Sequence, residues 1–226
     1  MKVTIAEELL LLAYSEDEGK QLISTMQLDP ALAGALLAEL AVEGRVELSD
    51  KKLVLTGTAP LGDDEPDDEL DDELKAVLSR VAGEHKERKP AWWVQRLQSS
   101  KLRTRLLTRL AEAGVLTEQR GKVLGLFPVT RWPEADPGVE AEVRERVASV
   151  LGGADPDART AALIAVMHAA KLDRKAFPGA SKERVKEISE GAWAGDAVAR
   201  TIASINAATV TAITAATVAA TAGGGG

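Results

Sequence analysis

The chain has 226 residues and a formal net charge of −7, and 45% of its residues are apolar, which is enough to bury a core in one large or two small soluble domains. Aromatic residues make up only 3%, and a core built from Leu, Ala, Val and Ile favours helices. The absence of cysteine excludes disulfides, thiolate metal sites and thiol nucleophiles.

The N-terminal stretch predicts a short helix. Thr4 and Glu7 have the spacing of a capping box, and the helix continues through Leu9–Tyr14 until the polar residues 15–19 break it. We expect no signal peptide here, because the leucine run is only four residues long and glutamates precede it.

A second helix and a β-hairpin follow. Asp29-Pro30 is a cap residue followed by proline, a pattern that predicts a helix start, and Gly44 predicts the end of that helix. The segments Arg45–Leu48 and Leu53–Thr56 flank a short polar turn and predict the hairpin.

The segment Leu61–Lys75 carries nine acidic residues. We expect a solvated linker over about 61–69, followed by acids at the N-terminus of a helix that continues to Val81. A calcium-binding loop is the alternative, but the stretch lacks both the Asp-x-Asp-x-Asp-Gly order and a glutamate at the twelfth position. Next, Lys89-Pro90 predicts another short helix, which contains two tryptophans.

The central segment predicts a helix and a second hairpin. Leucines at every fourth position from Leu102 predict an amphipathic helix that ends at Gly114. Two apolar runs, Val115–Leu116 and Val123–Phe127, flank the polar stretch Glu118–Lys122, which we interpret as the turn of the hairpin.

This central segment is also the most basic part of the chain. Residues 86–131 contain eleven Lys or Arg residues and three acidic residues, a net charge of +8. A local positive patch can bind the phosphates of an anionic membrane or of a nucleic acid. The alternative is that these cations pair with the acidic first part of the chain, because residues 1–85 have a net charge of −13.

Three further helices are expected beyond the second hairpin. One follows Asp136 and carries a valine stripe, and another is capped by Ser181. Between them, Ala158–Ala170 is almost fully apolar, which predicts a position at the centre of a helical bundle.

The C-terminal stretch Thr201–Gly226 has no charged residue. It is rich in Ala and Thr rather than in Leu and Phe, so we expect a helix that covers the core rather than a transmembrane span. A flexible glycine tail is expected at 223–226. Four residues fall roughly on one face and are expected to contact the core: Ile202, Ile205, Val210 and Ile213.

Part of the chain is similar to a later part. The twenty residues from Leu36 align without a gap with those from Leu106, at an offset of 70. Each unit predicts a helix, a glycine stop and a hairpin, the order found in winged helices. Duplication is one explanation, and chance similarity is the other. A winged-helix-like DNA-binding regulator is therefore an alternative function, although the net negative charge argues against it.

Catalytic motifs are absent from the sequence. It has no nucleophile elbow, phosphate loop, dinucleotide-binding glycine pattern or paired-histidine zinc motif. His85 and His168 fall in different predicted helices, and we expect His168 to be a hydrogen-bonded core residue. We therefore expect no enzymatic activity, no cofactor and no metal.

Four stretches resemble the Golgi phosphoprotein 3 family in their order and spacing: Thr4–Gly19, Leu36–Leu48, Leu102–Glu118 and Ala162–Phe177. The resemblance covers nearly the whole chain. It implies an all-α fold, mainly a helical bundle with one or two short β-hairpins, as a single domain over residues 1–222. The ending rich in Ala, Thr and Val and the acidic composition suggest a bacterial, actinobacterial member.

The resemblance also implies a function. Eukaryotic members are non-enzymatic peripheral membrane proteins that bind phosphatidylinositol 4-phosphate and hold glycosyltransferase tails in the Golgi. Their lipid pocket uses one Trp and three Arg, which correspond here to Ser24, Ala33, Ser100 and Arg103. Only the last of these matches, so the resemblance implies a looser anionic site around Arg103.

We therefore expect a non-catalytic cytoplasmic protein that associates peripherally with an anionic membrane at its inner face, with no nucleic acid as partner. A lipid-independent protein-interaction scaffold remains an alternative, and a protein client and homo-oligomers are compatible with either. Five cations are candidates for contact with lipid phosphate: Arg96, Lys101, Arg103, Arg105 and Arg109. Three hairpin residues are candidates for apolar membrane contact: Leu126, Phe127 and Trp132.

Overall fold

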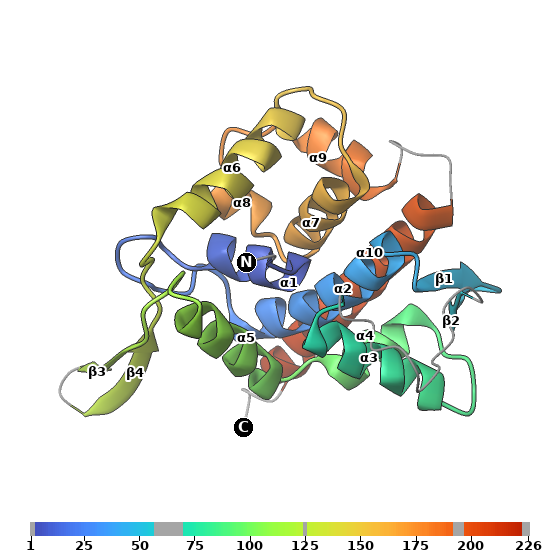
Figure 1. Cartoon of the computed structure of the whole chain (residues 1–226), viewed down its shortest axis with the longest axis horizontal. Coiled ribbons are helices and arrows are strands. Elements are labelled where there is room, and N and C mark those ends of the chain that lie inside the picture. The colour runs from blue at the N-terminus through green and yellow to red at the C-terminus, as the bar shows by residue number, and fades with distance from the viewer. Residues whose placement is uncertain (1–2, 57–69, 124–125, 192–196, 223–226) are drawn as a thin grey trace.

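The computed structural model describes residues 3–56, 70–123, 126–191 and 197–222. This part of the chain contains ten helices and two separate two-stranded antiparallel sheets (Figure 1). The predicted all-α class with two short β-hairpins is confirmed. The expected acidic linker at 61–69 and the glycine tail at 223–226 lie outside the described residues.

The helices are α1 (Ile5–Ala13), α2 (Thr25–Val42), α3 (Asp72–Gly83), α4 (Pro90–Leu97), α5 (Ser100–Glu112), α6 (Pro137–Leu151), α7 (Ala158–Ala169), α8 (Asp173–Ala176), α9 (Lys182–Ser189) and α10 (Ala197–Ala222). The strands are β1 (Val46–Ser49), β2 (Lys52–Leu55), β3 (Gln119–Val123) and β4 (Phe127–Arg131).

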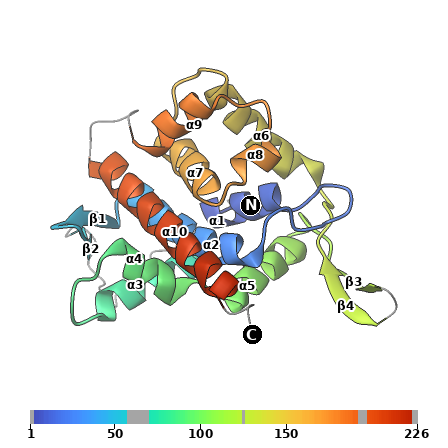
Figure 2. The same ribbon diagram turned by 180° about the vertical axis from the view of Figure 1, so that it is seen from behind.

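The centre of the molecule is the pair α2 and α10, which lie side by side in both views (Figures 1 and 2). Helices α1 and α7 also pack on α2, and all residues of α1 are buried. The predicted central position of α7 is confirmed, because all but three of its residues are buried. Helices α6, α8 and α9 pack on α7 on one side of this centre, and α3–α5 lie on the other (Figure 1).

The N-terminus of α1 is capped as predicted. The Thr4 backbone N–H donates to Glu7 Oε2 at 2.7 Å, and the Glu7 N–H donates to Thr4 Oγ1 at 3.2 Å. This reciprocal pair satisfies two backbone donors that the helix itself leaves free, so α1 can begin inside the core.

Helix α2 begins earlier than predicted. The backbone N–H and the hydroxyl of Ser24 both donate to Gln27 Oε1, at 3.2 and 2.9 Å, and α2 starts at Thr25. The predicted start at Asp29-Pro30 is therefore wrong, and Pro30 lies inside the helix. A proline removes only one backbone donor, and the Ser24–Gln27 cap fixes the first turn upstream of it.

The two similar units share their helix ends but not their hairpins. Gly44 and Gly114 have φ values of 66° and 75°, and in each unit the residue after the glycine donates its N–H to the carbonyl oxygen five residues earlier. This is the six-to-one bond of a Schellman cap. Beyond the caps the units diverge, because β1 begins two residues after its glycine and β3 begins five residues after.

The second hairpin is shifted from its predicted position. The stretch Glu118–Lys122, predicted as the turn, lies mostly in β3, which pairs with β4 from Gln119↔Arg131 to Val123↔Phe127. The predicted turn is therefore wrong. Val115 and Leu116 are each 4% exposed, so they fill the core instead of forming the first strand.

Helix α10 covers the core with its first half. Ile202, Ile205 and Ile213 are buried as predicted, whereas Val210 is 42% exposed, so its predicted core contact is wrong. The buried neighbour is Thr209, which faces Gly34 of α2. By length and composition α10 could cross a membrane, and it is the one described helix that could, yet it packs on α2, α4 and α7.

Candidate functional site

Helix α5 presents its leucines to the core and three of its four cations to the neighbouring helices. The hydroxyl of Ser99 accepts the Leu102 N–H at 3.1 Å and caps the helix start. Four leucines of α5 are buried: Leu102, Leu106, Leu107 and Leu110. The basic side chains therefore project from the remaining faces, and those of Arg103, Arg105 and Arg109 reach the parts of α1, α2 and α3 that flank α5.

Arg103 forms an ion pair within the protein. Its guanidinium binds the carboxylate of Asp29 in α2, and the two side chains are only 16% and 18% exposed. Burial raises the pKa of Asp29, and the adjacent Arg103 opposes this rise. Burial likewise raises the pKa of Tyr14, which lies near this pair, to about 12.

Arg105 and Arg109 are paired as well. Arg105 binds Glu73 of α3 through two nitrogens, at 2.5 and 2.8 Å, and this hydrogen bonding raises the arginine pKa. Arg109 donates to Glu7 at 2.7 Å and to Asp71 at 2.5 Å. Burial disfavours the charge of Arg109, but the two carboxylates outweigh it and raise its pKa.

All four of these carboxylates belong to residues 1–85, the acidic first part of the chain. For Arg103, Arg105 and Arg109 the structure therefore shows the pairing that the sequence allowed as the alternative to a free cationic surface. These pairs also tie α5 to α1, α2 and α3, so part of the basic charge holds the helices together.

Arg96 and Lys101 differ from these three arginines. Both side chains are exposed, and neither forms an ion pair or a hydrogen bond with a described residue. Arg96 lies in the last turn of α4, and Lys101 lies in the first turn of α5. The connection between α4 and α5, which we call the α4–α5 junction (residues 96–101), thus carries two cations available to an anionic partner.

A cavity of about 310 Å³ adjoins this junction. Its lining comes from the first turns of α2, the α4–α5 junction and the second half of α10: Thr25, Met26, Asp29, Pro30, Gln98, Ser99 and Ala216. Ser24 and Ser100, which correspond to lipid-binding positions of the resembled family, are sequence neighbours of lining residues. Arg103 is ion-paired to the lining residue Asp29. We call this space the junction cavity.

The hairpin residues occupy different environments. Leu126 lies in the turn between β3 and β4 and is 77% exposed. Trp132 is only 7% exposed, and its backbone N–H donates to the Gly19 carbonyl at 3.0 Å. This burial corrects the expectation that Trp132 contacts a membrane, because its indole fills the core at the base of the hairpin. Phe127 begins β4, and its side chain lies outside the described structure.

The histidine that the sequence singled out is hydrogen bonded. His168 Nδ1 lies 3.1 Å from Asp173 Oδ2, and the imidazole is 35% exposed, so it sits at the edge of the core rather than within it. Over the described ranges, no group of three or more His, Asp or Glu side chains is arranged to hold a metal ion.

Sequence reasoning missed Asp29 as part of the candidate site. It was assigned only as a helix cap, yet it lines the junction cavity and neutralises Arg103. The available signal was its position: an acid on the core side of a helix requires a cationic partner, because an unpaired buried charge is costly.

Comparison with known families agrees with this architecture. Residues 5–205 match the model of the family described as Golgi phosphoprotein 3 (GPP34). The matched region runs from the start of α1 into α10 and so includes the α4–α5 junction, both hairpins and every lining residue of the junction cavity except Ala216. The chain therefore belongs to the Golgi phosphoprotein 3 (GPP34) family.

Proposed function

We propose that this protein is a non-catalytic peripheral membrane protein that binds anionic lipid headgroups at the α4–α5 junction. Its family is known for peripheral Golgi proteins that bind phosphatidylinositol 4-phosphate. The observation that carries the proposal is the pair of exposed cations, Arg96 and Lys101, beside a cavity of headgroup size.

A lipid phosphate would bind first to these two cations, since their charges are not neutralised within the described structure. Each basic residue near an anionic surface contributes about 1 kcal/mol to binding, so the two together give weak, reversible association. Arg103 would join only where the phosphate replaces Asp29 as its partner. The junction cavity would then hold the headgroup between α2 and α5.

The surroundings of the junction suit a membrane surface. Helix α5, the strands β3 and β4 and the C-terminal end of α10 lie along the same edge of the molecule (Figures 1 and 2). This edge carries exposed apolar side chains, Leu126 in the hairpin turn and Val218 near the end of α10, at 77% and 61% exposure. Cations next to protruding apolar groups are typical of proteins that lie on a bilayer.

We also propose that the site selects charge rather than one headgroup. Of the family's four pocket positions, Ser24, Ala33 and Ser100 cannot supply the indole or guanidinium contacts, and only Arg103 remains. Two exposed cations without fixed partners respond to the negative charge of the bilayer surface more than to the chemical identity of one headgroup. We place this association at the cytoplasmic leaflet.

Co-sedimentation with vesicles tests the proposal. The protein is expected to sediment with phosphatidylcholine vesicles that contain phosphatidylglycerol at 20 mM salt, to be released at 500 mM salt, and to remain soluble with pure phosphatidylcholine. Equal binding to both vesicle types at low salt would refute it. A labelled DNA duplex serves as the second probe, and salt-sensitive DNA binding without vesicle binding would instead support the winged-helix alternative.

A further inference from the structure

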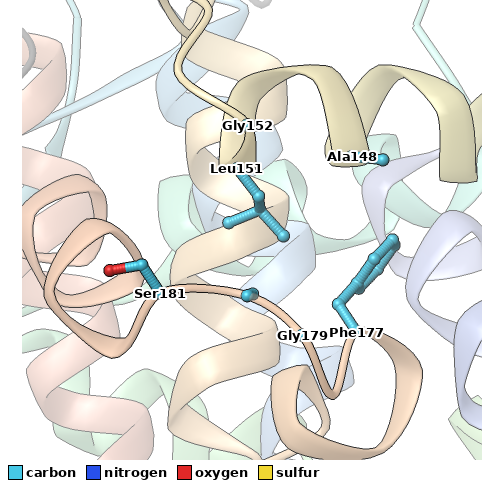
Figure 3. A pocket seen from close by; sticks show the side chains of 7 residues that line it. Ala148, Leu151, Gly152, Phe177, Gly179 and Ser181 are labelled. Atoms are coloured by element: carbon cyan, nitrogen blue, oxygen red, sulfur yellow. The ribbon is translucent and has the colours of Figure 1, made fainter.

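A second cavity lies at the other end of the molecule, among α6, α8 and α9 (Figures 1 and 3). It has a volume of about 290 Å³ and is lined by Ala148, Leu151, Gly152, Phe177, Gly179, Ala180 and Ser181. The side chains of Leu151 and Phe177 point into the space between the end of α6 and the α8–α9 connection (Figure 3). We call this space the α6–α9 cavity.

The lining of the α6–α9 cavity is apolar in its chemistry. Ser181 is its one polar side chain, and this hydroxyl is already used, because it accepts the Arg184 N–H at 3.3 Å and donates to Glu183 at 3.0 Å. The carbonyl of Val150, at the end of α6, accepts from the Arg184 side chain at 3.3 Å. An apolar side chain can therefore enter without removing a hydrogen-bond partner from any lining side chain.

The α8–α9 side of the α6–α9 cavity is basic. Residues 171–186 contain six Lys or Arg residues and two acidic residues, a net charge of +4. Arg174 and Lys175 lie in α8, which ends just before Phe177; both are exposed and form no ion pair with a described residue. Lys182, which follows Ser181, is exposed as well. Three exposed cations therefore flank the α8–α9 side of the cavity, the basic rim, and this side complements acidic groups.

The shape of this surface distinguishes its partner from a bilayer. The exposed large apolar side chains of the described structure are Met26, Leu55, Leu126, Val210 and Val218, and none of them belongs to α6, α8 or α9. A membrane-binding surface inserts protruding apolar groups, whereas a concave apolar site with a cationic rim receives a protruding group from its partner.

We propose that the α6–α9 cavity is a docking site for an acidic peptide segment of a partner protein, with one Leu, Met or Phe side chain inserted and flanking carboxylates on the basic rim. The helices that line the site lie at the end of the molecule opposite the edge assigned to the membrane, so a bound partner would remain accessible while the protein lies on the bilayer (Figure 1). The proposal does not depend on lipid binding.

Fluorescence anisotropy with three labelled peptides tests this site. The probe has a central phenylalanine flanked by three glutamates on each side. One control peptide replaces the phenylalanine with serine, and the other replaces the glutamates with lysine. Only the probe is expected to bind, at low ionic strength. Equal binding of the serine control would overturn the proposal, because charge alone would then explain the interaction.

Protein variants locate the binding. Ala148→Trp places a large side chain in the cavity from an exposed position of α6, and is expected to weaken probe binding at least tenfold. Ser149→Trp is the matched control, since Ser149 is exposed on α6 but does not line the cavity, and it should bind as the wild type does. Circular dichroism verifies that both variants remain folded.

Charge reversal separates this site from the proposed membrane site. The double variant Arg174→Glu with Lys175→Glu is expected to bind the probe at least tenfold more weakly than the wild type and to bind anionic vesicles as the wild type does. Unchanged peptide binding in this variant or in Ala148→Trp would refute the docking site. Loss of vesicle binding instead would mean that this basic rim faces lipid, which also refutes it.

Discussion

Arg103 is bound to an anionic group of the protein itself, and a membrane would offer it another anionic group. The carboxylate of Asp29 and a lipid phosphate are both anions that a guanidinium binds strongly, so they compete for one cation. The raised pKa of Asp29 indicates that burial makes the charge of this acid costly even with Arg103 beside it. An incoming phosphate therefore competes for Arg103 with a carboxylate whose negative charge is destabilised by burial.

Substitutions of the two residues of this pair should differ in their effect on lipid binding. Asp29→Asn keeps the side-chain shape and removes the competing charge, so it should tighten binding to anionic vesicles by about three- to tenfold, the effect of one additional available cation. Arg103→Ala should not tighten it. Vesicle titration measures both, with neutral vesicles as the control. Weaker binding in Asp29→Asn would show that the pair only stabilises the fold.

A second buried carboxylate, in α6, makes stability depend on pH. Glu140 is 3% exposed and accepts from Arg144 Nε at 2.7 Å. Burial raises its pKa from 4.5 to about 7, Arg144 opposes this shift, and the acids Glu134 and Glu16 add to it. The folded state therefore holds a proton that the unfolded state has lost between these two values.

Because the folded state keeps this proton to a higher pH than the unfolded state does, the stability of the protein should fall as the pH rises. The contribution of Glu140 is fully present below its unfolded pKa and is lost as the pH rises toward about 7. At about 1.4 kcal/mol for each pKa unit, the total is up to about 3 kcal/mol. Urea unfolding of wild type and Glu140→Gln from pH 5 to pH 8 measures it. The variant should show a flatter decline, and an identical slope would contradict the assignment.

At the scale of elements, the contact between α2 and α10 depends on one small residue. A Cβ atom placed on Gly34 would lie 2.3 Å from the Thr209 hydroxyl oxygen, so the two helices approach as closely as they do only because this position is glycine. Thr209 is fully buried and donates to the Ile205 carbonyl at 2.9 Å.

A double substitution tests this contact, because the effect of Gly34→Ala on stability should change sign when Thr209 is also replaced. Gly34→Ala alone should destabilise the protein by about 1–3 kcal/mol, because it overpacks the interface. In a Thr209→Ala background the clash disappears, and the same change should be neutral or stabilising, since alanine is favoured over glycine in helices by about 1 kcal/mol. Thermal unfolding of the four proteins measures this. Additive effects would contradict the close approach.

The elements that sequence reasoning predicted well are those that depend on local contacts. The cap at Thr4 and Glu7, the helix starts at Lys89-Pro90 and Ser181, and the glycine stops at Gly44 and Gly114 each involve residues a few positions apart. The start of α2 was missed although Ser24 and Gln27 are also local, because the proline pattern at Asp29-Pro30 was given more weight.

The candidate site was less predictable because its geometry depends on distant residues. Arg103 and Asp29 are 74 positions apart, and Arg109 and Glu7 are 102 apart, so periodicity and local charge could not show that they meet. The same holds for Trp132, whose burial depends on the loop at Gly19. Charge counts located the basic segment correctly but could not separate its paired arginines from Arg96 and Lys101.

At the scale of the whole molecule, the central helices separate two surfaces with different chemistry. The edge with the α4–α5 junction combines exposed cations with protruding apolar groups, and the opposite end has a concave apolar cavity with a basic rim (Figures 1 and 3). An adaptor needs such a separation, because a membrane and a protein partner must bind at the same time without competing for one surface.

We propose that Arg96 and Lys101, and not basic charge in general, bring the protein to an anionic membrane. Vesicle titration of two double variants with the same change in net charge tests it directly: Arg96→Ala with Lys101→Ala, and Arg174→Ala with Lys175→Ala. The account predicts at least a tenfold loss of affinity for phosphatidylglycerol-containing vesicles in the first variant, and wild-type binding in the second. Equal affinity of the two variants would contradict it.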